Sequence, residues 1–409
     1  MGSVPLSLEQ FLPEDGFSGT LVGRAWISTP TTISTPTTTS TPGEGAGPVV
    51  IAIREGGIYD ISEVAPTMCE LLEAPNPAAS VKAAHGKRIA SIEELVGNSG
   101  RERLNPQKPL LLAPCDLQVI KAAGVTFASS LIERVIEEQA RGNPARAEAV
   151  RKQVVGLIGE NLRTVKPGSP QAMKIKQVLI EQGLWSQYLE VGIGPDAEVF
   201  TKAPVLSSVG SGADIGIHPD SAWNNPEPEI VLAVNSRGET VGATLGNDVN
   251  LRDFEGRSAL LLPKAKDNNA SCAIGPYLRL FDATFSIDDV RRSTVNLLVE
   301  GADGFTLRGA SSMREISRDP LDLVTAAMGL YHQYPDGMVL FLGTMFAPTE
   351  DRGQPGSGFT HKVGDIVSIS SAKLGTLVNR VDHCDRIAPW TFGLRALLHK
   401  LAARQKVQS

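Results

Sequence analysis

The sequence predicts an α+β protein with a curved or barrel-like mixed sheet at its centre. Short β-rich runs alternate with Gly, Pro and Asp turns over residues 200–378. Helical periodicity covers most of residues 129–191, and one further helix, at 321–331, interrupts the later strands. Strands and helices that gather in separate stretches of the chain are typical of an α+β fold with a strongly curved sheet.

The first 110 residues predict a small β-rich domain. Residues 23–27 and 48–53 have strand character, and the turn at 54–57 indicates a hairpin. Between these strands, residues 28–47 are a low-complexity Ser/Thr/Pro-rich segment without apolar periodicity. We expect a surface loop there, inserted between two paired strands. Short helices are predicted at 68–72 and 92–96.

Residues 111–409 predict the larger, second domain. The proline-rich stretch 106–114 indicates an extended crossing segment, and residues 119–127 begin as a strand. A long amphipathic helix is predicted from about 129 to 139. The helical pattern then continues over 144–191 with a break at 167–170. Later strands are predicted at 293–299, 337–344 and 364–369.

Composition narrows the class of protein. The chain has 409 residues, a net charge of −6 and a pI of about 5.7, which do not favour a nucleic-acid-binding surface. Its four cysteines form no Cys-x-x-Cys pair, which argues against a disulfide framework or a structural zinc site. No apolar run reaches the roughly 18 residues of a membrane span, and no secretory signal is recognised. We therefore expect a cytoplasmic protein without a membrane partner.

Three carboxylates predict a metal site. Glu227 and Glu229 are two residues apart at the start of an apolar strand, so their side chains lie on the same face. Asp248 can return to that face if residues 235–238 form a hairpin turn. Neighbouring carboxylates repel one another unless a positive charge lies between them. Oxygen ligands of this kind suit Mg²⁺ or Mn²⁺.

The order of motifs after Glu227 resembles the fumarylacetoacetate hydrolase family. Glu-x-Glu is followed by Gly-Asn-Asp-x-x-x-Arg-Asp at 246–253, by Lys266, and later by Leu-Gly-Thr at 342–344. The resemblance covers roughly residues 110–380. It implies a mixed β-sandwich roll, usually a homodimer, with a smaller N-terminal domain. It also implies that Glu227, Glu229 and Asp248 hold the metal.

The same resemblance implies catalytic residues and shows where this chain departs from the family. Lys266 matches the active-site lysine, and Thr344 matches the threonine of the Gly-Thr-Pro loop, although Met345 replaces the proline. Glu133 matches the glutamate of a His-x-x-Glu pair, but Ser130 stands where hydrolase members have the histidine. A His-Glu pair activates the attacking water, so its loss disfavours hydrolysis of a C–C bond.

The compact spacing from Glu229 to Lys266 resembles the 2-keto-3-deoxy-pentonate dehydratases of the family. Their substrate is a small 2-keto acid, which chelates Mg²⁺ and loses a C3 proton and the C4 hydroxyl. Lys266 could act as acid or base if its pKa is lowered. A hydrolase of 2,4-diketo acids is the alternative enzyme, and a scaffold without catalysis is the third hypothesis.

Several neighbouring residues admit purely structural interpretations. Lys264 is an alternative to Lys266 that fits the motif spacing less well. Arg252 and Asp253 are expected to form an ion pair beside the site, and Glu133 is as readily a salt-bridged helix residue. Ser130 can cap its helix. The candidates for binding the substrate carboxylate are Arg279, Arg314 and Arg318.

Overall fold

The computed structural model describes residues 7–28, 46–100, 105–158, 165–181, 183, 185–346, 348–353 and 358–408. Most of the predicted low-complexity loop lies outside these residues. The strands on either side of it, β1 (Thr20–Ile27) and β2 (Gly47–Arg54), pair antiparallel from Leu21 opposite Ile53 to Ile27 opposite Gly47. The segment therefore connects two paired strands, as predicted.

The larger layer is an 11-stranded sheet in the order β4-β3-β2-β1-β13-β11-β10-β16-β6-β7, with β5 paired to β1. Its other strands are β3 (Gly57–Asp60), β4 (Lys87–Ala90), β5 (Leu110–Leu112), β6 (Val119–Ala123), β7 (Val199–Ala203), β10 (Pro228–Val234), β11 (Thr240–Asp248), β13 (Cys272–Leu280) and β16 (Met338–Phe341). Only β16 and β6 pair in parallel within it; the other pairs are antiparallel.

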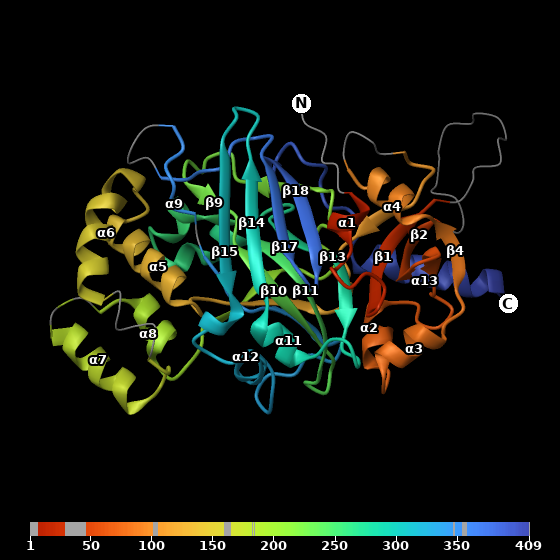
Figure 1. The fold of residues 1–409 in the computed structure, drawn as a ribbon, viewed down its shortest axis with the longest axis horizontal. Helices are drawn as coiled ribbons and strands as arrows, with labels where there is room; N and C mark the ends of the chain where they lie inside the picture. Colours follow the sequence, from red (N-terminus) through yellow and green to blue (C-terminus); the bar gives the residue numbers. More distant parts are fainter. Residues whose placement is uncertain are drawn as a thin grey trace.

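The smaller layer has five strands in the order β15-β14-β17-β18-β8. They are β8 (Asp214–Ile217), β14 (Thr294–Glu300), β15 (Thr306–Ser312), β17 (Ile366–Ser371) and β18 (Gly375–His383), and a separate short pair is formed by β9 (Asn224–Asn225) and β12 (Asn250–Leu251). Figure 1 shows β14, β15, β17 and β18 in front of β10 and β11. One buried cluster contains Ile230 and Leu245 from the large sheet with Val295 and Ile369 from the small one. The two sheets therefore pack face to face, in an α+β architecture.

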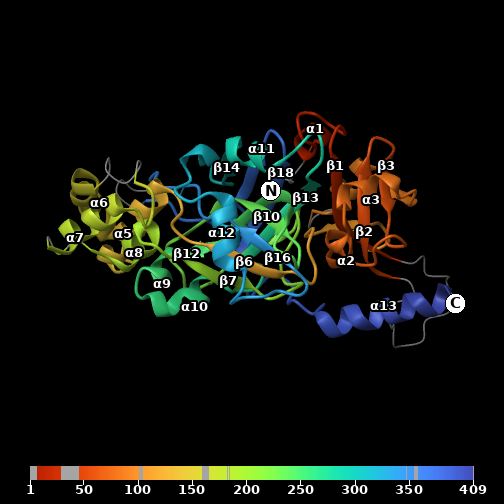
Figure 2. The ribbon, with the colours of Figure 1, turned by 90° about the horizontal axis from the view of Figure 1, so that it is seen from below.

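Two groups of helices lie at opposite ends of the molecule, and others, which include α11 (Ile287–Arg292) and α12 (Pro320–Ala327), lie along its middle (Figure 1). They are α1 (Leu8–Phe11), α2 (Met68–Glu73), α3 (Pro77–Ala83), α4 (Ile92–Asn98), α5 (Ala128–Ala140), α6 (Pro144–Ile158), α7 (Pro170–Glu181), α8 (Gln187–Ile193), α9 (Arg252–Glu255), α10 (Leu262–Lys266), α11 (Ile287–Arg292), α12 (Pro320–Ala327) and α13 (Leu394–Gln408). Figures 1 and 2 both place α5 to α8 at one end and β1 to β4 with α13 at the other. Among the described residues, no helix combines the length and the apolar character that a membrane span requires.

The N-terminal strands are continuous with the central sheet. β1 pairs with β13 from Thr20 opposite Leu280 to Val22 opposite Leu278. Buried clusters cover both faces of β2. Ile51 packs in one of them, and Val50 packs in the other together with Leu278 and Leu280 of β13. The division into two domains at residue 110 stays a prediction.

The helix predicted at 321–331 is shorter in the structure. It begins at Pro320, where Asp319 caps it through Leu321 N–H, and it ends at Ala327. Met328 is extended, and Gly329 then pairs with His332. Glycine is a poor helix former, so the helix ends before it although the apolar residues continue.

Gly246 gives a test of the packing behind β11. A Cβ at this position would lie 2.3 Å from Phe341 Cε1 and 2.6 Å from Val231 Cγ2, both in the core. We expect Gly246→Ala to lower the free energy of unfolding by about 1–3 kcal/mol because a packed core resists added volume. Gly97→Ala is the control, since a Cβ on this α4 glycine meets no atom within 4 Å. Chemical denaturation measures the free energy of unfolding of both variants. Equal values for the two would contradict the expected effect of Gly246→Ala.

Candidate metal centre and active site

A single antiparallel register aligns the three carboxylates. Glu229 lies opposite Gly246 in the β10–β11 ladder, and Asn225 lies opposite Asn250 in the β9–β12 ladder. These two pairings belong to one continuous antiparallel register. In that register Glu227 lies opposite Asp248. The backbone N–H of Asp248 indeed donates to the Glu227 carbonyl at 3.1 Å. Because side chains alternate between faces, all three carboxylates share one face.

The carboxylates form a buried group that fits a divalent cation. One oxygen from each of Glu227, Glu229 and Asp248 lies within 4.8 Å of the others, and all three residues are at most 2% exposed. Three carboxylate oxygens at this spacing suit a hard ion such as Mg²⁺ or Mn²⁺. The structure thus brings together the three residues that the sequence predicted.

Glu229 provides the test of that fit. Its Oε2 accepts the Gly343 N–H at 2.7 Å and its Oε1 accepts the Thr344 hydroxyl at 3.4 Å. Burial, followed by the negative charges of Asp248 and Glu227, raises the pKa of Glu229 well above its usual value. No described Lys or Arg forms an ion pair with it. A cation held by the three carboxylates would supply the positive charge that this carboxyl lacks.

Lys266 lies between two of the carboxylates. It is the last residue of α10, and its Nζ is 2.5 Å from Glu227 Oε2 and 3.0 Å from Asp248 Oδ2. Burial opposes its charge, but the charges of Asp248 and Glu227 outweigh burial and raise the pKa of Lys266. A lowered pKa, the condition under which the sequence allowed Lys266 an acid or base role, is not met, because two buried carboxylates surround the ammonium. Lys264 is exposed on the outside of the same helix, over the Phe254 ring.

Arg134 and Lys202 add two further positive charges to the site. Arg134, on α5, binds Glu227 through Nη2, and its Nη1 lies 2.7 Å from Glu137 Oε2 and 3.0 Å from Glu255 Oε2. Lys202, on β7, is fully buried with its Nζ 3.0 Å from Asp248 Oδ1. Burial alone would raise the pKa of Glu227, but Arg134 and Lys266 hold it at about 2.

Glu227 and Asp248 line a small cavity beside the carboxylate group. The cavity is lined by Ala123, Gly124, Val125, Ser130, Arg134, Glu198, Phe200, Glu227, Asp248, Glu255, Lys266 and Thr344. Two of these residues carry carboxyl groups outside the metal set. Burial raises the pKa of Glu198, and burial with the charges of Glu227 and Glu137 raises the pKa of Glu255 to about 7, against the pull of Arg134 and Lys266. Gly124 leaves space for Glu198, because a Cβ there would lie 1.8 Å from Glu198 Oε2.

Of the remaining predicted residues, Ser130 and Thr344 line this cavity and Glu133 does not. The Ser130 hydroxyl donates to the Phe127 carbonyl at 2.9 Å. It caps no backbone N–H of α5, so the expected capping role of Ser130 is wrong. Glu133 turns aside to Arg252 Nη2, 2.9 Å from its Oε2, and to Arg151, whose Nη2 is 2.7 Å from the same oxygen. The alternative interpretation of Glu133 as a salt-bridged helix residue describes its contacts.

The expected pair between Arg252 and Asp253 does not form. Arg252 binds Glu133 and, through Nε at 2.6 Å, Glu137. Asp253 accepts hydrogen bonds from the Ser221 hydroxyl and the Ala222 N–H instead. Adjacent residues of a helix point in different directions, which separates the two charges.

None of the three arginines suggested for the substrate carboxylate lines the cavity. Arg279 is fully buried and holds Asp15 through two 2.7 Å contacts, and Arg318 donates to backbone carbonyls near the end of α8. Arg134 is the cavity arginine instead. Its position four residues after Ser130, on the same helical face, was the signal that could have identified it.

Comparisons with known proteins agree with this geometry. Residues 177–382 match the family described as fumarylacetoacetate (FAA) hydrolase C-terminal. A probable 2-keto-3-deoxyxylonate dehydratase from Haloferax volcanii is 32% identical over 201 residues, which are 49% of this chain and 65% of that protein. A 2-dehydro-3-deoxy-D-arabinonate dehydratase from Saccharolobus solfataricus is 32% identical over 187 residues, 45% of this chain and 58% of the relative. The matched segment thus spans less than two thirds of each relative.

Solved structures show the same fold. A 2-keto-3-deoxyarabinonate dehydratase has a TM-score of 0.59 at 20% identity, over 90% of this chain and all of that one. A 2-keto-3-deoxy-D-arabinonate dehydratase complexed with magnesium and 2,5-dioxopentanoate has a TM-score of 0.57 at 19% identity, with coverage of 90% and 100%. A fumarylacetoacetate hydrolase from Exiguobacterium antarcticum has a TM-score of 0.53 at 15% identity, with coverage of 89% and 99%. The motif order, the fold and a family match over half of its length show that the chain belongs to the fumarylacetoacetate hydrolase family.

Proposed function

We propose that the protein is a Mg²⁺- or Mn²⁺-dependent hydro-lyase that removes water from a 2-keto-3-deoxy-pentonate and yields a 2-keto acid semialdehyde. The observation that carries this proposal is the buried group of Glu227, Glu229 and Asp248 with Lys266 between two of them. The names of the two curated relatives, and the solved neighbour that holds magnesium and 2,5-dioxopentanoate, support it. The cytoplasmic location and the homodimer stay predictions.

Glu227, Glu229 and Asp248 would hold the ion. When bound there, the ion would act as a Lewis acid that binds the keto-acid head and stabilises negative charge on the keto oxygen. Lys266 is buried next to the same carboxylates with its pKa raised, so it carries a proton that it can give. Glu198 lines the same cavity, where burial raises the pKa of its carboxyl and so makes the carboxylate a stronger base than usual.

We assign the elimination to these two groups. Glu198 takes the C3 proton, the C4–O bond breaks, and Lys266 protonates the leaving hydroxyl to give water. The product has a C3=C4 double bond. Transfer of a proton from C5 to C3 gives the C4=C5 enol, and transfer of the C5 hydroxyl proton to C4 then gives the semialdehyde. Two titratable groups with different protonation states in one cavity provide the acid and the base that such a step needs.

Ser130 favours elimination over hydrolysis. Its hydroxyl is committed to the Phe127 carbonyl, and none of the described residues that line the cavity is a histidine. A hydrolase must activate a water molecule, which a His-Glu pair does in other members, and Glu133 here is held by Arg151 and Arg252. Hydrolysis of a 2,4-diketo acid remains the second candidate function because its keto-acid head is the same.

The reaction is tested by mixing the purified protein and Mg²⁺ with 2-keto-3-deoxy-xylonate and 2-keto-3-deoxy-arabonate. We expect 2,5-dioxopentanoate by mass spectrometry. Lys266→Met and Glu198→Gln should each lower kcat by about 10²- to 10⁴-fold, because each removes one partner of the proton transfer. Lys264→Met, an exposed lysine of the same helix, should leave kcat unchanged. Acid products from a 2,4-diketo acid, with no reaction of either pentonate, would favour the hydrolase.

Binding of Mg²⁺ should release protons and strengthen as the pH rises. In the metal-free protein the raised pKa of Glu229 keeps its carboxyl protonated up to a higher pH than usual, and the ion must displace that proton. Calorimetry in buffers of different ionisation enthalpy counts the protons. Glu229→Gln should abolish the release and weaken Mg²⁺ binding at least about 10-fold, whereas the exposed control Glu239→Gln should change neither. Proton-free binding by the wild type would contradict the assignment.

Arg134 should be essential for the stability of the site. Arg134→Gln leaves Glu227, Glu137 and Glu255 buried around a neutral side chain. We expect a loss of about 3–5 kcal/mol in the free energy of unfolding, as for other broken buried ion pairs. The control, Arg292→Gln, breaks a mainly exposed pair with Asp289 and should cost less than about 1 kcal/mol. Denaturant titrations compare the two, and similar losses would disprove the role.

A further inference from the structure

Lys202 is a fully buried lysine that takes no part in the proton transfers of the proposed elimination. It lies on β7, none of its side chain is exposed, and it does not line the cavity beside the metal ligands. Burial of an ammonium group is unfavourable unless carboxylates or other acceptors surround it. The partners of Lys202 therefore indicate what its charge does in the fold.

A β-bulge directs Lys202 into the interior. Thr201 of β7 lies opposite Lys121 of β6. The next pair is Ala203 opposite Ile120, so Lys202 is an extra residue of β7 between the two pairs. A bulge bends its strand and re-aims the side chains beside it. Lys202 and Ala203 are accordingly both buried, although they are neighbours in the strand, whereas Thr201 is exposed.

The Lys202 ammonium contacts Lys266 at the backbone and through a shared carboxylate. Its Nζ donates to the backbone carbonyl of Lys266, the last residue of α10. It also lies 3.0 Å from Asp248 Oδ1, while the Lys266 Nζ lies 3.0 Å from Oδ2 of the same carboxylate. Lys202 thus binds both the main chain of Lys266 and the group that holds the Lys266 ammonium. Two such contacts restrict where that ammonium can lie.

Ser271 supports the same arrangement. Its hydroxyl lies 3.3 Å from Lys202 Nζ and donates to the Lys266 carbonyl at 2.8 Å. The hydroxyl oxygen also accepts the Asn268 N–H at 2.9 Å. A carbonyl at the end of a helix has no partner further along the helix, so Lys202 and Ser271 satisfy that of Lys266. The end of α10 is therefore fixed by a buried ammonium and a buried hydroxyl.

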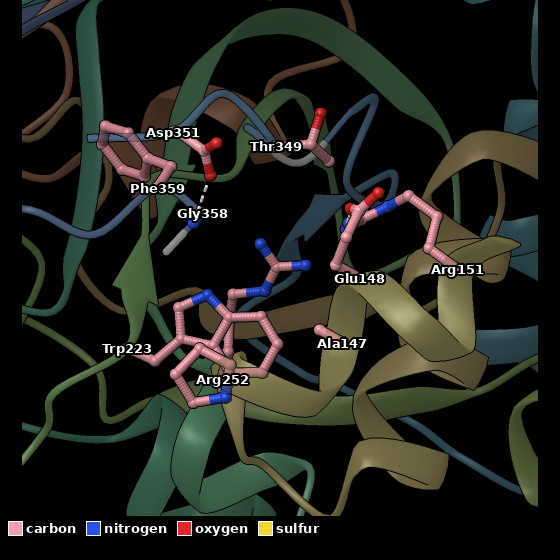
Figure 3. A pocket seen from close by; sticks show the side chains of 10 residues that line it. Ala147, Glu148, Arg151, Trp223, Arg252, Thr349, Asp351, Gly358 and Phe359 are labelled. Carbon is pink, nitrogen blue, oxygen red and sulfur yellow. Dashed lines mark hydrogen bonds and ion pairs between the residues drawn. The ribbon is translucent and has the colours of Figure 1, made fainter. Parts of the chain in front are cut away.

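The neighbouring buried arginines bind other groups. Arg252 has its guanidinium 4.5 Å from the centre of the Trp223 ring (Figure 3), and it binds two glutamates of α5. Arg134 binds one metal ligand and two further glutamates. Among the described residues, Lys202 is the cation whose side chain hydrogen-bonds to the backbone of Lys266.

We propose that Lys202 is a positioning residue for Lys266, the acid of the proposed elimination, and this role rests on that proposed function. Lys202 does not line the cavity, so it acts through Lys266 rather than on the substrate. By fixing the Lys266 backbone and Asp248 Oδ1, it keeps the Lys266 ammonium where it protonates the hydroxyl that leaves C4. Glu198, the proposed base, directly precedes β7. One edge strand of the large sheet thus places both the acid and the base.

Lys202→Met removes the ammonium and keeps a side chain of similar length. At saturating Mg²⁺ we expect kcat for the pentonate to fall about 10- to 100-fold, because a small displacement of a reacting group has an effect of this size. KM should change less than about twofold, since Lys202 does not contact the substrate. Ser271→Ala removes the second donor to the Lys266 carbonyl and should lower kcat by a smaller factor. The control is Lys121→Met, beside the same bulge, whose Nζ binds Thr201 at 3.1 Å; kcat should not change.

A substrate analogue with fluorine in place of the C4 hydroxyl separates loss of the positioned acid from general damage to the site. Fluoride leaves without a proton, so its elimination needs the base but not the acid. We expect Lys202→Met and Lys266→Met to slow the loss of water much more than the loss of fluoride. Equal losses for the two leaving groups in Lys202→Met, or an unchanged kcat with the hydroxyl substrate, would overturn the proposal.

Crystal structures of the wild type and of Lys202→Met test the position of Lys266 without any reaction. We expect the Lys266 Nζ of the variant to move by roughly 1 Å relative to Glu227 and Asp248. An unmoved Lys266 would contradict the positioning role. If the wild type converts neither pentonate, the proposed function fails, and this comparison still decides whether Lys202 positions Lys266. Should Lys202→Met not fold, Ser271→Ala takes its place in both the leaving-group and the structural comparison.

Discussion

The site depends first on the strand register that sets Glu227 opposite Asp248. Side chains alternate between the faces of a strand, so a shift of β11 by one residue would bring Asn247 or Val249 opposite Glu227 and move Asp248 to the wrong position. Glu229 is further fixed by the N–H of Gly343. Gly343 lies in the loop that follows β16, and β16 pairs with β10, the strand that carries Glu229. The carboxylates are thus positioned by the backbone of the large sheet before any side chain contacts them.

Burial of so many charges is explained by chemistry rather than by stability. Ion pairs inside a protein barely offset the loss of hydration, and apolar residues of similar size are often as stable. Here Arg134, Lys202 and Lys266 surround the metal carboxylates, yet the pKa of Glu229 is still raised. If the site needed no cation, we would expect each of its carboxylates to have a positively charged partner, and Glu229 has none among the described Lys and Arg side chains. Functional sites are where such departures from the most stable arrangement are expected.

Sequence reasoning found the residues that lie close together in the chain. The spacing of Glu227, Glu229 and Asp248 and the strand pattern were sufficient for the metal group, and the motif order located Lys266 and Thr344. Partners brought in by long-range packing had no local signal. Glu198 precedes β7 without any pattern around it. The Glu133 side chain points away from the cavity because Arg252 and Arg151 bind its carboxylate. Neither arginine belongs to the motif that contains Glu133. The α+β class was predictable, but the pairing of β1 with β13, about 250 residues away, was not.

A line of alternating charges runs from the metal centre to the surface. Each residue contacts the next in the order Glu227, Arg134, Glu137, Arg252, Glu133 and Arg151. Side-chain exposure is at most 8% in the first four, 12% at Glu133 and 25% at Arg151. Loss of any inner member removes one opposite charge from each of its two neighbours in a buried environment. During evolution the inner positions should therefore change together, as oppositely charged pairs, more often than the solvent-facing end. Covariation among relatives should be stronger among Glu227, Arg134, Glu137 and Arg252 than at the more exposed Glu133 and Arg151.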